Sequence, residues 1–245
     1  VSEGLVFADQ DDFYQLVKTV MVKDERFFDK FDRAMKDYFE GIETFDLDEL
    51  LKQVHKLPKD WFDLELLEKS KLAVVGTRNA SENGIQSVQK IIKELNNRFV
   101  IVSGMARGID TVAHIASLKN GGQTIAVIGT GLDNVYPKEN KELQHYIGKH
   151  QLVLTEYEPN AQPLKYHFPE RNRIIAGLAE SLVVCEAKIR SGSLITCERA
   201  LEEGREVYAI PGSIVDGKSD GCHHLIQEGA KCITSGLDIL SDYRF

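Results

Sequence analysis

The sequence predicts an α/β fold in which a doubly wound, mostly parallel β-sheet follows a small helical domain. From Lys71 onward, short continuous apolar runs alternate with amphipathic segments. Continuous apolar runs are typical of strands buried on both faces, and strict alternation of strand and helix is typical of parallel sheets. The chain has 245 residues, of which 42% are hydrophobic and 28% charged, which suits one large domain plus a small one.

The N-terminal residues 1–66 are predicted to be helical and polar. Apolar residues recur there at spacings of three and four, in stripes that lie between residues 13 and 54. Several members of these stripes are phenylalanines, and such stripes form a helical core far more often than a ligand platform. We therefore divide the chain into a helical domain, 1–66, and an α/β domain, 67–245.

Each apolar run in the second part predicts one strand, with a weaker run at the end. In order, the predicted strands cover 72–76, 99–104, 124–131, 152–156, 181–187, 206–212 and 231–235. Amphipathic segments predict the helices between them, over 82–96, 109–120, 138–148, 169–179, 193–204 and 221–229.

Composition excludes several classes of protein. No apolar run approaches the 18 or so residues that a membrane span needs. The first residues turn acidic at once and do not resemble a signal peptide. The four cysteines form no CxxC pair, and the histidines have no metal-binding spacing. We therefore expect a cytoplasmic protein with no membrane contact, no metal ion and cysteines that are reduced.

The net charge of −8 at first argues against a nucleic-acid partner. However, residues 1–70 hold 18 acidic and 10 basic side chains, whereas residues 71–245 hold 20 of each. The excess negative charge thus lies in the N-terminal part. Because phosphate binding depends on the local field, the α/β part can still carry a basic groove.

Small and cationic residues follow five of the predicted strands. The carboxyl ends of parallel strands meet at one edge of the sheet, where ligands bind in such folds. Aromatic residues accompany these turns at Tyr136, Tyr166 and Phe168. A row of cations with aromatic neighbours suits an extended polyanion better than one mononucleotide, because cations track phosphates and rings stack on bases. The candidate residues are Arg78, Gly104, Arg107, Gly108, Lys138, Lys165, Ser191, Gly192 and Ser193.

The segment FPERNRIIAGL, residues 168–178, adds two further arginines. Pro169 fits the first position of a helix, which would place Arg171, Asn172 and Arg173 in the first turn. Cations are disfavoured there by the helix dipole, so their presence suggests that an anion meets them. The alternative is that both arginines pair with the nearby acids Glu170 and Glu180 on a solvated face.

Motifs of the common nucleotide-dependent enzymes are missing from the sequence. There is no GxGxxG after the first strand, no P-loop and no GxSxG turn, and no nucleophile–base pair stands out. We therefore expect no catalytic residues and no cofactor.

An alternative function is that of an enzyme, a nucleotide-cleaving phosphoribohydrolase of the lysine-decarboxylase-like group. Its PGGxGT motif is reduced here to Pro211-Gly212-Ser213, without the second glycine. A protein scaffold without nucleic acid is a third possibility.

Six motifs occur together and in order: SGMARGID, TIAVIGTGLD, FPERNRIIAGL, RSGSLIT, IPGS and GCHHLIQEGA. This set, over about residues 71–240, closely resembles the DNA-processing protein A (DprA, Smf) family. The resemblance implies a Rossmann-like domain that binds single-stranded DNA, forms a homodimer and loads the RecA recombinase during natural transformation. The helical domain, 1–66, would correspond to the family's N-terminal domain of the sterile-alpha-motif type. Members of that family are not established enzymes.

The resemblance also implies roles for particular residues. Arg107, Arg171, Asn172 and Arg173 would line the DNA pocket, with Arg78, Lys138 and Lys165 as further phosphate contacts. Gly104, Gly108 and Ser191 to Ser193 would donate backbone N–H groups. Leu225 and Ile226 would form part of the dimer surface, with burial in the core as the alternative.

Three features depart from the family pattern. His223 replaces a common asparagine, and Asp63 to Ser70 lacks the usual aromatic- and proline-rich segment. The chain also ends soon after the last strand, so we expect no winged-helix domain.

Overall fold

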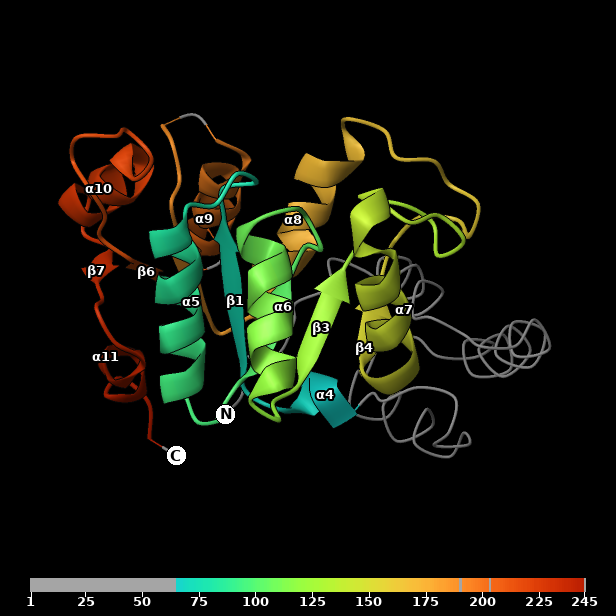
Figure 1. Cartoon of the computed structure of the whole chain (residues 1–245), viewed down its shortest axis with the longest axis horizontal. Coiled ribbons are helices and arrows are strands. Elements are labelled where there is room, and N and C mark those ends of the chain that lie inside the picture. The colour runs from blue at the N-terminus through green and yellow to red at the C-terminus, as the bar shows by residue number, and fades with distance from the viewer. Residues whose placement is uncertain (1–64, 190, 203, 245) are drawn as a thin grey trace, which may run out of the picture.

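The computed structural model of the chain describes residues 65–189, 191–202 and 204–244 (Figure 1). All but the last two residues of the predicted helical domain, 1–66, lie outside the described residues. Leu66, which the prediction assigned to that domain, lies in α4 (Glu65–Glu68) and is buried in the core of the α/β part.

The described residues form a seven-stranded sheet in which every neighbouring pair of strands is parallel. The strand order is β4-β3-β2-β1-β5-β6-β7, so the chain winds outward to β4 and then returns to the other side of β1. This confirms the predicted doubly wound sheet and places the change of direction between β1 and β5. The strands are β1 (Lys71–Gly76), β2 (Val100–Ser103), β3 (Thr124–Val127), β4 (Leu152–Leu154), β5 (Ser181–Cys185), β6 (Glu206–Ala209) and β7 (Lys231–Cys232).

Helices cover both faces of the sheet, and Figure 1 shows α5 and α6 in front of β1 with α9 behind it. One face carries α5 (Glu82–Glu94), α6 (Ile109–Lys119), α7 (Lys141–His150) and the short C-terminal α11 (Gly236–Leu240). The other face carries α4, α8 (His167–Leu178), α9 (Gly192–Glu202) and α10 (Asp220–Gln227). A 3-10 turn, η1 (Lys138–Asn140), precedes α7.

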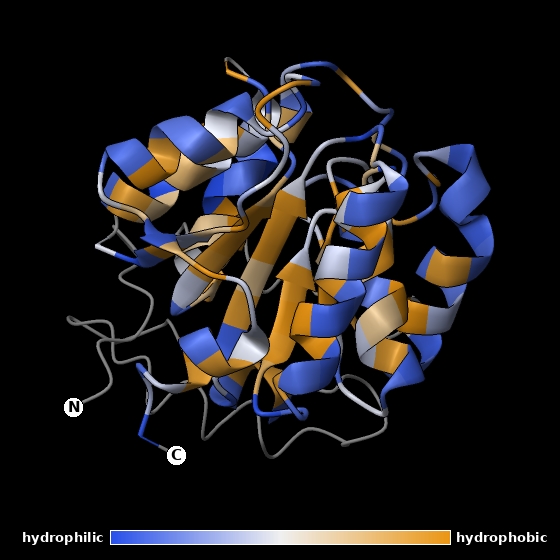
Figure 2. Cartoon of the chain, turned by 60° about the vertical axis from the view of Figure 1, so that its left-hand side comes forward, coloured by the Kyte–Doolittle hydropathy of each residue, from blue (hydrophilic) through white to orange (hydrophobic). Residues whose placement is uncertain are grey.

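The strands are apolar along both faces, as their continuous runs predicted. Within β1, Leu72 and Val74 pack with α5 and α6, whereas Ala73 and Val75 pack with the helices of the opposite face. Figure 2 shows this distribution, with hydrophobic strands at the centre and hydrophilic residues on the outer sides of the helices. The two helical layers therefore hold the carboxyl ends of the strands in fixed positions along one edge.

The start of α8 corrects one sequence prediction. The helix begins at His167, so Pro169 is its third residue and not its first. Proline is tolerated throughout the first turn, because the N–H groups there have no partner within the helix. As a consequence Arg171 and Arg173 lie in the second turn, and the argument from the helix dipole does not apply to them.

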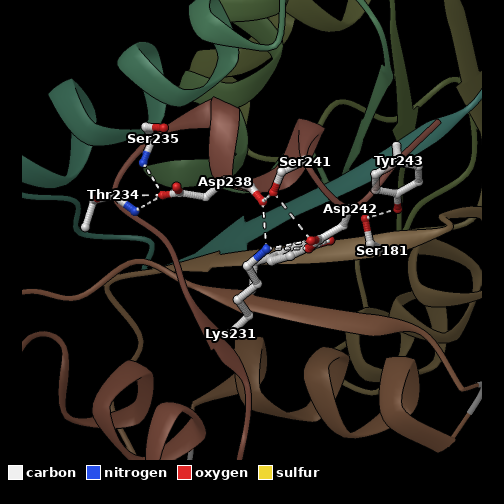
Figure 3. A network of polar contacts seen from close by, with 9 residues as sticks. Ser181, Lys231, Thr234, Ser235, Asp238, Ser241, Asp242 and Tyr243 are labelled. Atoms are coloured by element: carbon white, nitrogen blue, oxygen red, sulfur yellow. Dashed lines mark hydrogen bonds and ion pairs between the residues drawn. The ribbon is translucent and has the colours of Figure 1, made fainter. Parts of the chain in front are cut away.

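A polar network ties the C-terminal helix to the sheet (Figure 3). The Lys231 ammonium contacts Asp242 Oδ2 at 2.6 Å and donates to the Asp238 carbonyl at 2.8 Å. The Tyr243 hydroxyl donates to Ser181 Oγ on β5 at 2.7 Å. Ser235 and Asp238 form a capping box at the start of α11. The network lies away from the carboxyl ends of the central strands, and it secures the chain end to β5, β6 and β7.

Candidate nucleic-acid interface

Two contiguous cavities lie at the carboxyl edge of the sheet, with volumes of about 370 and 400 Å³. They share Arg78, Ala106, Phe168 and Arg171 as lining residues. The larger cavity lies beyond the ends of β1 and β5, where the winding of the sheet changes direction. Of the residues predicted from sequence, the cavities bring together Arg78, Gly104, Arg107, Arg171, Asn172, Ser191, Gly192 and Ser193.

Arg171 forms part of the wall from beneath, because its side chain is buried and only 4% of the residue is exposed. Its Nη1 donates to the Gly104 carbonyl at 2.6 Å and also to the Val127 carbonyl. Arg171 therefore pairs with neither Glu170 nor Glu180 and joins the ends of β2 and β3. Burial lowers the pKa of Arg171 to about 10, against a raising effect of Asp110, so the guanidinium stays charged at neutral pH.

The turn between β2 and α6 is built around this arginine. A Cβ on Gly104 would lie 2.7 Å from Arg171 Nη2, so only glycine fits there without a shift. Asp110 accepts the backbone N–H groups of Gly104 at 3.2 Å and Ala106 at 3.3 Å. Burial raises the pKa of Asp110 to about 6, although Arg171 acts in the opposite direction. The carboxylate thus shapes the turn that carries Arg107.

Arg107 pairs with Glu139 on η1, and the Arg107 side chain remains 62% exposed. Arg173 likewise pairs with Glu156 and remains 60% exposed. Ion pairs at this level of exposure contribute little to stability, so both guanidinium groups can exchange their partner for a stronger anion.

The turn after β1 presents Arg78 to solvent. Its guanidinium carbon lies 5.7 Å from the centre of the Phe168 ring. A Cβ on Gly108, whose φ is 73°, would lie 2.3 Å from the Thr77 carbonyl oxygen. Gly108 therefore serves close backbone packing beneath the Arg78 turn, and it is not among the lining residues.

Two aromatic rings stand at the rim of the smaller cavity. Tyr136 and Phe168 have ring centroids 5.1 Å apart with a tilted arrangement, and Tyr136 is exposed. Lys138 is exposed and follows the lining residue Pro137 directly. Lys165 is exposed in the segment before α8. These two lysines and Arg173 do not line the cavities, so they flank the site without forming its wall.

The start of α9 closes the larger cavity. Ser193 Oγ donates to the Gly76 carbonyl at 2.8 Å, which holds the helix against the end of β1. The Ser191 hydroxyl is buried and has no hydrogen-bond partner among the described residues, although Ser191 lines the cavity. The first backbone N–H groups of a helix also lack partners within it. This corner of the cavity therefore offers donors for an anion.

Sequence reasoning missed Asn79 and gave Lys188 no role, although both line the cavities. Their position directly after β1 and β5 was the available signal. Leu225, a predicted dimer residue, is 8% exposed and belongs to the core with Cys222, whereas Ile226 is half-buried beside it. For Leu225 the alternative of core burial is what the structure shows.

A family model described as DNA recombination-mediator protein A matches residues 43–244 of the chain. The chain belongs to this family. It is 58% identical over 229 residues to the DNA processing protein DprA of Streptococcus pneumoniae, an alignment that covers 90% of this chain and 81% of that protein.

Two solved structures of the family show the same fold. The X-ray structure of DprA from S. pneumoniae matches with a TM-score of 0.73 and 67% identity, over 75% of this chain and 65% of that one. The structure of DNA processing protein A from Helicobacter pylori, which describes its single-stranded DNA binding mode, matches with a TM-score of 0.69 and 30% identity. That match covers 75% of this chain and 86% of the other.

Membrane spans and metal clusters are both absent from the part of the chain that the structure describes. None of the helices there is both long and apolar enough to cross a membrane. In the same residues no three His, Cys, Asp or Glu side chains are grouped so that they could hold a metal ion.

Proposed function

We propose that this member of the recombination-mediator family captures single-stranded DNA along the carboxyl edge of its sheet and delivers it to the RecA recombinase. One observation carries the proposal. Turns from β1, β2, β3 and β5 and the first turns of α8 and α9 surround two contiguous cavities that combine exposed cations with aromatic rings. The role is one of binding, and no covalent step is assigned to the chain.

The donors in the cavities suit phosphate groups. Arg78 and Lys188 are exposed on the wall, and the unpartnered Ser191 hydroxyl lies beside the start of α9. Charged donors and helix N-termini both bind phosphate oxygens well. The Tyr136 and Phe168 rings at the rim provide faces on which bases can stack, each stack contributing about 1–3 kcal/mol.

The distribution of cations favours an extended strand over a single nucleotide. Lys138 and Lys165 lie outside the cavities but on turns of the same edge. A mononucleotide that filled one cavity would not need them, whereas a strand that leaves the cavity would pass such residues. The H. pylori relative, whose structure describes single-stranded DNA binding, supports the same choice.

The partner and the assembly rest on the family resemblance. We propose RecA as the recipient of the DNA and a homodimer as the active form, with the half-buried Ile226 on α10 at or near the subunit contact.

The phosphoribohydrolase alternative finds less support in the site. Asp110 is the one acidic residue among the described residues that line the cavities, and its carboxylate is occupied by two backbone N–H groups.

Charge reversal at the rim tests the proposal. Arg78→Glu and Lys165→Glu should each weaken binding of every single-stranded oligonucleotide alike, because each change removes a cation that neutralises a phosphate and adds repulsion. Fluorescence anisotropy over a salt series should also show a smaller dependence of log Kd on log salt, by about 0.7 for each phosphate that is no longer neutralised.

Lys119→Glu is the matched control, because it makes the same change of charge at the far end of α6. Equal affinity of all three variants and the parent protein at low salt would refute the assigned groove. Release of free base from a nucleoside monophosphate would instead favour the hydrolase.

A further inference from the structure

The turn after β5 contains a residue in an unusual conformation. Glu186 has a φ of 49°, in the left-handed region that residues other than glycine rarely adopt. It is also 8% exposed, although a glutamate is seldom buried without a specific partner. Such combinations persist where the surrounding structure requires them, and they gather at functional sites.

The partner of Glu186 is the residue that ends the Arg78 turn. Glu186 Oε2 accepts the backbone N–H of Ser81 at 2.8 Å, and Oε1 accepts the Ser81 hydroxyl. Ser81 is the N-cap of α5 and in turn accepts the N–H of Gly84 at 3.1 Å. A Cβ on Gly84 would lie 2.5 Å from the carboxylate, so the glycine makes room for it.

The other end of the same turn is also fixed. The Thr77 carbonyl accepts the N–H of Ile109, and the Gly76 carbonyl accepts the Ser193 hydroxyl. The segment from Thr77 to Ser81 is thus fixed at both ends, and at the Ser81 end it is fixed by Glu186. Arg78 and Asn79, the two cavity-lining residues between these points, are exposed.

We propose that Glu186 is a positioning residue for DNA binding, which sets Arg78 over the cavity by anchoring Ser81. This inference rests on the proposed function, because it needs DNA at Arg78. Glu186 is not among the lining residues of either cavity, so it acts through the turn and not by contact with DNA.

The direction in which removal of the Glu186 charge changes DNA affinity separates this role from simple electrostatics. Removal of a negative charge near a DNA site strengthens binding, because repulsion of phosphates falls. If Glu186 positions Arg78, Glu186→Gln should instead weaken binding of a single-stranded oligonucleotide, by about fivefold to tenfold. Glu82→Gln, which neutralises an exposed acid on the first turn of α5, is the matched control and should bind as tightly as the parent or slightly more tightly.

A double-mutant cycle with Arg78→Ala identifies the route of the effect. In the Arg78→Ala background, Glu186→Gln should change the affinity by less than about twofold, because the turn no longer carries the side chain that it positions. Ser81→Ala removes the hydroxyl partner and should weaken binding in the same way, which provides a second test if Glu186→Gln does not fold. Circular dichroism establishes folding of each variant.

The outcomes are distinct. If Arg78→Ala weakens binding but folded Glu186→Gln and Ser81→Ala bind as the parent does, the positioning role is refuted and the proposed function stands. The same holds if Glu186→Gln has its full effect without Arg78. If Arg78→Ala itself binds as the parent does, the DNA site at this cavity is wrong, and the inference falls with it.

Discussion

At the scale of single residues, the site depends on buried ionisable groups beneath its exposed cations. Arg171 and Asp110 are both buried, and neither presents its charge directly to solvent. Arg171 donates to backbone carbonyls at the ends of β2 and β3. Asp110 accepts backbone N–H groups of the turn after β2. Buried charges in the cavity wall therefore hold the turn that carries the exposed Arg107.

A third buried group, His114, extends this cluster on α6. Its Nδ1 lies 2.6 Å from Thr124 Oγ1, and that hydroxyl donates to the Ile101 carbonyl, so Nδ1 carries the proton of the neutral ring. Its Nε2 has no hydrogen-bond partner among the described residues. Burial, with a smaller effect of Arg171, lowers the pKa of His114 to about 3.

His114 and Asp110 should have opposite effects on stability as the pH falls. The folded-state pKa of His114 lies below its unfolded value of 6.5, so the unfolded state takes up more protons and stability is lost below that pH. Between pH 7.5 and 5 this loss is about 2 kcal/mol. The pKa of Asp110 is raised to about 6 on folding, so the folded state takes up more protons than the unfolded state as the pH falls. This uptake increases the stability by about 1 kcal/mol over the same range.

Urea unfolding at the two pH values measures this difference. Asp110→Asn should lose more stability than the parent on going to pH 5, because the compensating gain is gone. His114→Leu should lose less stability than the parent between pH 7.5 and pH 5, or should gain stability, whatever its free energy of unfolding at pH 7.5. Identical pH dependence in the parent and both variants would contradict the assignment of these two pKa shifts.

At the scale of elements, sequence reasoning succeeded where a pattern is local. Continuous apolar runs identified the strands, since a strand buried on both faces has no alternative composition. The start of α8 was placed two residues late, because the proline suggested a first position that the chain does not use. The burial of Arg171 was not predictable, because its carbonyl partners lie 67 and 44 residues away in the chain.

In the candidate site, too, sequence reasoning found the residues with a local signal and missed roles that depend on distant residues. Arg78, Arg107 and the Ser191 turn were found because each follows a strand directly. Glu186 also follows a strand, but its role depends on Ser81, which is 105 residues distant. Whether an acid repels a ligand or anchors a neighbouring turn is a tertiary property that residue type does not reveal.

The C-terminal helix offers a prediction of its own. Ser235 is the N-cap of α11, and its side chain accepts the Leu237 N–H. Ser235→Ala should lower the free energy of unfolding by about 1 kcal/mol, the usual cost of removing a cap. Because α11 packs against α5 away from the cavities, DNA affinity should not change. A fall in affinity for a folded Ser235→Ala variant would show that the chain end communicates with the site.

At the scale of the whole molecule, the winding of the sheet decides where a ligand can bind. The change of direction between β1 and β5 separates the helices that follow them, and the larger cavity lies in that gap. The seven strands among the described residues are all parallel, so their following turns lie on the same edge (Figure 1). A chain with net charge −8 can thus present a local row of cations to DNA.

The most direct test of this account is a hydrogen–deuterium exchange footprint of the intact chain with and without single-stranded DNA. Protection on binding should concentrate in the turns after β1, β2 and β5 and at the start of α8. The turns at the opposite edge, around 96–99 and 120–123, should exchange as in the protein without DNA. Protection at that opposite edge, with none around Arg78, Arg107 and Ser191, would contradict the claim that DNA lies along the carboxyl ends of the strands.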